Sequence, residues 1–283
     1  MSYFHLNLIL KGKLTVCCLL MLPAIPLNAQ REAKQIGDFK ESISLNEHLR
    51  GTKRTLQYRP DGDEFVCVNG KNRYTRALYG SHSPFRVETS DRPVFAFYNN
   101  GRGGNISFKV ILRDGTELAL DCTGHCESRY SAGKRTYYLT DPSWGKGELR
   151  ISVLALADMD GAIWRFSPSN MPKGAILRWQ HGGATGKRLS RNGDMGVDPA
   201  DCFELPVEAT DLVTGELPLQ KEVYLVRGEV PEDYNVRKLY QQAEAASLAL
   251  ASHLKIETPD PYLNTLGGAL VAAADGIWDG QVW

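Results

Sequence analysis

The chain has 283 residues, and its 33 basic and 33 acidic side chains give a formal net charge of +0. This length is sufficient for one or two domains with a sizeable core. Because there is no basic excess, a nucleic-acid-binding protein is not indicated, and we expect no nucleic-acid partner.

The amino terminus has the pattern of a secretory signal peptide. Lys11 and Lys13 precede the apolar run "LTVCCLLML", and the small residue Ala29 follows shortly after it. A charged start, a short apolar run and a small-residue cleavage site are typical of export signals. The run is too short to cross a bilayer as a helix. We therefore expect residues 1–29 to be cleaved, the mature protein to be periplasmic or extracellular, and the chain to have no membrane span.

Residues 30–54 are interpreted as an N-terminal extension, and residues 55–230 as a β-sandwich domain. Within the second range, roughly a dozen short runs rich in β-branched and aromatic residues are separated by Gly, Pro, Asn and Asp. Phe108 and Val110 alternate with polar neighbours such as Lys109, which indicates a strand with one buried face. The fold class predicted from this pattern is mainly β, with a large antiparallel sandwich.

The sequence of this region also predicts a long loop and the location of five aromatic residues. The polar, glycine-rich stretch from Gly182 to Asp201 is too long for a hairpin turn and predicts a long loop. Five aromatic residues lie in or near strands, and most of them are expected in the core, while a minority could form a platform that stacks on sugars. They are Tyr137, Tyr138, Trp144, Trp164 and Trp179.

After residue 230 the pattern changes from strands to helices. Residues 231–257 contain an alanine-rich segment without Gly or Pro, which predicts a long linker helix from about Glu232 to Leu254. Residues 258–283 begin a second helix, because Asp260 can cap it and Pro261 suits its first position.

The cysteines of the mature chain leave three alternatives open. Cys122 and Cys126 flank "TGH", and a zinc site would normally need a second close pair of ligands, which the sequence lacks. A disulfide across the turn at Gly124 is predicted, because disulfides are permitted in an oxidising compartment. Two buried free thiols are the remaining alternative. We expect no metal and no cofactor.

The candidate functional residues lie at the carboxyl end. No Gly-x-Ser-x-Gly and no His-Glu-x-x-His motif occurs, and no catalytic residue can be assigned. Asp275, Trp278, Asp279 and Trp283 place aromatic rings beside carboxylates after the second helix. Aromatic faces can stack on sugars while carboxylates bind hydroxyl groups, so these four are candidate carbohydrate contacts. The alternative for Trp278 and Trp283 is a packing role, in which they anchor the terminal helix on the body of the protein.

Two longer stretches carry a resemblance to a known family. "NGKNRYTRALYGSHSPFRVETSDRPVFAFY" and "RNGDMGVDPADCF" resemble an uncharacterised family from Gram-negative polysaccharide degraders. In that family such a sandwich precedes an (α/α)6 barrel. The order of exported sandwich, linker helix and second helix is likewise similar to the front of six-hairpin glycosidases. The resemblance covers about residues 55–283 and implies that the helix starting at Pro261 is the first helix of an incomplete barrel.

The resemblance implies the N-terminal part of a secreted glycoside hydrolase-like protein that acts on polysaccharide or oligosaccharide. Its catalytic barrel would be largely missing here and would be the intramolecular partner of residues 258–283. Hydrolysis in such enzymes uses a general acid and a second carboxylate. The alternative is a non-catalytic secreted sandwich that binds glycan or braces a partner protein.

Overall fold

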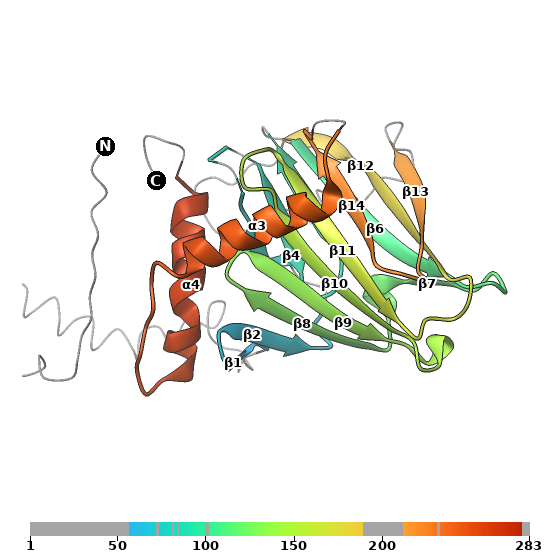
Figure 1. Ribbon diagram of the computed structural model, residues 1–283, viewed down its shortest axis with the longest axis horizontal. Helices are drawn as coiled ribbons and strands as arrows, with labels where there is room; N and C mark the ends of the chain where they lie inside the picture. The colour runs from blue at the N-terminus through green and yellow to red at the C-terminus, as the bar shows by residue number, and fades with distance from the viewer. Residues whose placement is uncertain are drawn as a thin grey trace, which may run out of the picture. The chain divides into compact units, whose positions relative to one another are not determined.

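The computed structural model describes residues 57–71, 74–80, 82–83, 85–99, 102–188, 212–230 and 233–278. All of them belong to one unit, Gln57–Trp283 (Figure 1). The signal peptide and the N-terminal extension predicted for residues 1–54 lie outside the described residues.

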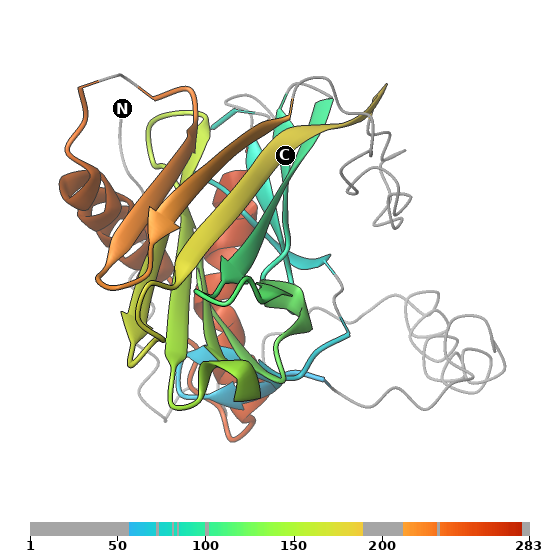
Figure 2. The ribbon, with the colours of Figure 1, turned by 90° about the vertical axis from the view of Figure 1, so that its right-hand side faces the viewer.

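Two antiparallel sheets of strands make up the body of this unit, as the sequence predicts (Figures 1 and 2). The first sheet has the order β1-β2-β8-β9-β10-β11-β14. Its strands are Arg59–Asp61, Glu64–Val68, His125–Ser131, Lys134–Thr140, Glu148–Ala155, Gly161–Ser169 and Val223–Gly228. The second sheet has the order β13-β12-β6-β5-β4-β3, and β7 pairs with β6. Its strands, from β3 to β7 and then β12 and β13, are Tyr74–Leu78, Arg86–Ser90, Phe95–Asn99, Arg102–Ile111, Glu117–Ala119, Ile176–Arg188 and Val213–Pro218.

The core lies between the two sheets. Phe95 of β5 packs edge-to-face against Tyr137 of β9 and Trp164 of β11, with ring centroids 5.7 and 5.6 Å apart. Phe108 and Val110 are buried while Lys109 between them is exposed, which confirms the predicted alternation.

One sequence-based expectation for the sandwich is confirmed and one needs adjustment. Four of the five aromatics predicted for the core, at positions 137, 144, 164 and 179, are buried, but Tyr138 is 38% exposed. Tyr138 follows an inward residue on β9, so the period of two in a strand turns it to solvent. The loop predicted from Gly182 is also shorter at its start, because β12 continues to Arg188.

A buried polar cluster joins the two sheets. Arg135 of β9 and Asp91, just after β4, are both fully buried, and the hydroxyl of Tyr58 donates to the Asp91 carboxylate. The Nη2 atom of Arg135 donates to that hydroxyl at 2.5 Å and to the carbonyl oxygen of Ser90 at 3.2 Å. Tyr137 also donates to the Ser90 oxygen, at 2.7 Å. These bonds offset part of the cost of desolvating the charges.

Helix α3 (Val236–Ala251) lies on the outer face of the first sheet (Figure 2). Tyr240 and Ala243 of α3 form a second apolar cluster with Leu154, Leu156 and Ile163 from β10 and its neighbours. The carboxyl half of β10 is therefore buried on both faces and loses the alternation of its first half.

The linker helix is shorter than the sequence predicts. It starts at Val236 because the Asn235 side chain accepts from the backbone N–H of Lys238 at 3.0 Å, and it ends at Ala251. It therefore covers fewer residues than the predicted span from Glu232 to Leu254.

Helix α4 (Pro261–Gly276) stands at one end of the sandwich and contacts β1 and α3 (Figure 1). Asp260 caps it as predicted, by accepting from the N–H of Tyr262 at 2.8 Å. The hydroxyl of Thr265 donates to the carbonyl oxygen of Gly62 in the β1–β2 turn at 2.9 Å. Small residues, among them Gly267, let α4 approach its neighbours closely.

Candidate functional site

A cavity of about 230 Å³ lies where the end of the sandwich meets α3 and α4. Strand β3 and the segment after it form one wall, the end of β10 a second, and the two helices with Gly133 of the β8–β9 turn the rest. Many of the lining residues have small apolar side chains. The alanines among them are Ala77, Ala155, Ala157, Ala243, Ala246 and Ala272.

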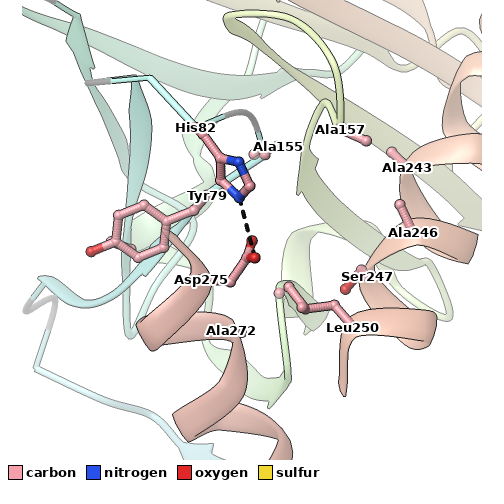
Figure 3. A pocket seen from close by; sticks show the side chains of 13 residues that line it. Tyr79, His82, Ala155, Ala157, Ala243, Ala246, Ser247, Leu250, Ala272 and Asp275 are labelled. Carbon is pink, nitrogen blue, oxygen red and sulfur yellow. Dashed lines mark hydrogen bonds and ion pairs between the residues drawn. The ribbon is translucent and has the colours of Figure 1, made fainter. Parts of the chain in front are cut away.

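His82 and Asp275 form a polar pair at this cavity. The Nε2 atom of His82 lies 3.2 Å from Oδ1 of Asp275, and the side chains are 52% and 37% exposed (Figure 3). Asp275 comes from the last turn of α4, whereas His82 follows β3, so the pair joins segments 193 positions apart in the sequence. Because both side chains reach solvent, we place the pair at the mouth of the cavity.

Close backbone contacts hold the His82 segment in position. A Cβ atom at Gly80 would lie 1.9 Å from the carbonyl oxygen of Leu156, so only glycine fits there. The ring of Tyr79 packs on Gly276 at the end of α4. The hydroxyl of Ser83 donates to the Asp160 carboxylate at 2.5 Å, which ties this segment to the β10–β11 turn.

The opposite wall is fixed by a contact between α3 and the β8–β9 turn. Gly133 has φ +75°, and a Cβ there would lie 2.5 Å from the hydroxyl oxygen of Ser247. That hydroxyl donates to the carbonyl oxygen of Ala132 at 2.6 Å. The Ser247 proton is therefore engaged within the protein, although Ser247 lines the cavity.

The structure brings one of the predicted carbohydrate contacts into this cavity. Asp275 lines it, whereas Trp278 does not, although its backbone N–H donates to the carbonyl oxygen of Asp275 at 3.1 Å. Asp279 and Trp283 lie outside the described residues. No sequence motif indicates His82, whose pairing with Asp275 depends entirely on tertiary contacts.

The structure does not contain the predicted disulfide. Cys122 and Cys126 are both free thiols, the first exposed and the second buried. Cys126 faces inward on β8 and its Sγ atom lies 3.8 Å from the Asp91 carbonyl oxygen, while Cys122 ends a short 3-10 helix. Burial raises the pKa of Cys126 to about 12. Among the described residues, no group of three or more His, Cys, Asp or Glu side chains could hold a metal ion.

The described residues form a mainly β protein with two antiparallel sheets and two helices. A small cavity lies between the helices and one end of the sheets. Residues 100–230 match the family described as "Domain of unknown function (DUF4450)". This match runs from the start of β6 to the end of β14, and it includes Gly133, Ala155 and Ala157 of the cavity wall. Comparison with curated proteins finds no match. Within the described residues, neither helix is long and apolar enough to cross a membrane.

Proposed function

We propose that the chain is the sandwich and first helical part of a secreted glycoside hydrolase-like protein that acts on polysaccharide or oligosaccharide. In this proposal α4 begins a helical layer that continues the protein, and Asp275 and Trp278 contact the carbohydrate. The sandwich supports that layer and contributes one end of the binding region. The proposal rests on the sequence resemblance and on the surface of α4.

The supporting observation is the outward face of α4. Leu263, Leu270 and Ile277 are spaced seven residues apart and are 46%, 47% and 54% exposed. The helix Pro261–Gly276 carries a single charged side chain, Asp275, and that side chain lines the cavity. A helix that is apolar on all sides is typical of a buried helix. Here one side packs on the sandwich and the other is available to another layer.

The free energy available to such a layer can be estimated from these exposures. Full burial of a Leu or Ile side chain stabilises by about 1.5–3 kcal/mol relative to full exposure. Since each of the three side chains is roughly half exposed, covering them contributes roughly 2–4 kcal/mol in total. This contribution favours packing against an apolar helical surface that the chain itself supplies. A separate partner would need further contacts, because association costs about 4–15 kcal/mol.

The cavity by itself is suited to binding and not to hydrolysis. Asp275 is the one carboxylate among the described residues that line it, whereas glycoside hydrolysis commonly uses two. The purified chain alone should therefore release no reducing ends from a panel of plant and host polysaccharides. Turnover above the rate of a heat-denatured sample would instead place catalysis within the sandwich.

The gene itself tests the proposed helical layer. Reading beyond the codon for Trp283 should reveal an in-frame continuation that encodes further helical hairpins with apolar faces. A stop codon directly after Trp283 would favour the alternative, a non-catalytic module that binds glycan or braces a partner.

Carbohydrate contact at the end of α4 is tested separately by titration with oligosaccharides. Trp278→Ala should weaken binding by about tenfold through the loss of ring stacking. Tyr138→Ala removes an exposed aromatic ring from the sandwich and is the matched control, expected to bind like the parent. Equal loss in both variants, or no loss in either, would contradict the assignment of Trp278.

A further inference from the structure

The cavity beside His82 and Asp275 combines an apolar lining with a polar pair at its mouth, and both restrict the ligands that fit. We propose that it receives the methyl or acetyl group of a substituted sugar, with the sugar's hydroxyl groups bound by His82 and Asp275 at the mouth. This inference rests on the proposed carbohydrate function and adds the substrate class. The substituents that fit are the methyl group of a 6-deoxy sugar and the acetyl group of an N-acetylated sugar.

The walls of the cavity are built from methyl groups. Ala155, Ala243 and Ala272 are buried, and Leu250 adds a larger apolar surface. In Figure 3 the side chains of α3 face His82 and Asp275 across the cavity. The hydroxyl of Ser247 already donates to a backbone carbonyl. The Ser247 oxygen can then only accept a hydrogen bond from a ligand, and the remaining α3 side chains that line the cavity are apolar.

An unsubstituted sugar would fit this space poorly. A hydroxyl group placed among the alanines would lose its hydrogen bonds to water without gaining equivalent ones, which is unfavourable. A methyl group in the same place is transferred from water to an apolar surface, which is favourable. The volume of about 230 Å³ exceeds that of a few water molecules and lies below the range of drug-sized pockets. It suits one sugar substituent or a small ring.

The charges at the mouth also restrict the ligand. Asp275 contributes a carboxylate, and His82 a ring that can donate or accept a hydrogen bond. No Lys or Arg is among the described residues that line the cavity. An acidic sugar would therefore meet the Asp275 carboxylate without a Lys or Arg to compensate it, whereas neutral hydroxyl groups can bind both side chains. Figure 3 shows the Tyr79 hydroxyl pointing away from this pair, so the ring contributes surface and not a further polar group.

Saturation-transfer NMR with matched sugars tests the proposal on the purified chain. L-Fucose and L-galactose differ at one carbon, which bears a methyl group in the first and a hydroxymethyl group in the second. N-Acetylglucosamine and glucose form the second pair. We expect saturation to be strongest at the methyl protons and L-fucose or N-acetylglucosamine to bind about tenfold more tightly than its partner, as is usual for one apolar group in a pocket.

Two alanines of α3 provide the mutant and its control. Ala246 lines the cavity from its exposed rim, whereas Ala249, which is also exposed on the same helix, does not line it. Ala246→Leu should fill the space and abolish the methyl preference, while Ala249→Leu should leave it unchanged, with equal melting temperatures showing that both variants fold. Asp275→Asn should weaken binding of both members of a pair without removing the preference.

The outcomes separate this inference from the proposed function. Binding of all four sugars without a methyl preference, or a preference that survives Ala246→Leu, would overturn the cavity assignment and leave the carbohydrate function standing. Failure of every sugar and of the oligosaccharides would overturn both. A methyl preference lost in Ala246→Leu but retained in Ala249→Leu supports the cavity as the site.

Discussion

The buried pair of Arg135 and Asp91 allows a quantitative prediction about the sandwich. Replacing Arg135 with Met keeps a long side chain but removes the guanidinium that donates to Tyr58 and Ser90. The Nη2 atom lies 3.7 Å from Oδ1 of Asp91, and both side chains are fully buried. Removing one partner of a buried ion pair costs about 3–5 kcal/mol, because the other charge stays desolvated.

This cost should appear as a large loss of thermal stability. For a domain of this size, 1 kcal/mol corresponds to about 2–4 °C, so Arg135→Met should lower Tm by roughly 6–20 °C. Arg129→Met is the control, because Arg129 pairs with Asp61, Glu64 and Glu127 at the partly exposed surface. Such pairs contribute at most about 1 kcal/mol. Calorimetry and urea unfolding would measure both variants.

A double-mutant cycle separates the charge from the packing. In the Arg135→Met background, Asp91→Asn removes the remaining buried charge while keeping the shape of the side chain. It should recover at least about 1 kcal/mol of the lost free energy of unfolding, within the range expected for residues in one network. If Arg135→Met costs less than Arg129→Met, or if the effects of Arg135→Met and Asp91→Asn simply add, the buried pair does not stabilise the contact between the sheets.

Three further predictions concern backbone packing, thiols and export. Gly80→Ala should destabilise the end of the sandwich, because its Cβ would clash with the Leu156 carbonyl oxygen; a melting temperature unchanged from the parent would contradict this contact. Cys122 should be alkylated in the folded, unreduced protein and Cys126 only after unfolding, because the first is exposed and burial raises the pKa of the second to about 12. Peptide mapping that finds the two linked would instead establish the disulfide that the sequence predicts. The secreted protein should begin at the residue after Ala29, and amino-terminal sequencing that starts at the initiator Met would refute cleavage.

Local sequence patterns predicted much of the architecture. The alternation around Phe108 and Val110 identified a strand with one buried face, and Asp260 with Pro261 identified the start of α4. These features depend on hydrogen bonds and burial within a few residues of each other, so a single sequence contains the information. The burial of most of the sandwich aromatics was predictable for the same reason. Which of the five turns to solvent was not, because the face of Tyr138 depends on the register of β9.

The candidate site depended on contacts that the sequence does not reveal. The pairing of β2 with β8 leaves β3 to the second sheet, and this strand order places the segment after β3 beside the end of β10. The docking of α4 then brings Asp275 to within 3.2 Å of His82. The same strand order buries Arg135 next to Asp91. Residues that are distant in the chain meet only when the sheets stack and the helices pack. The sequence therefore determined the elements and their buried faces, and the tertiary structure decided which polar groups share a cavity or a core.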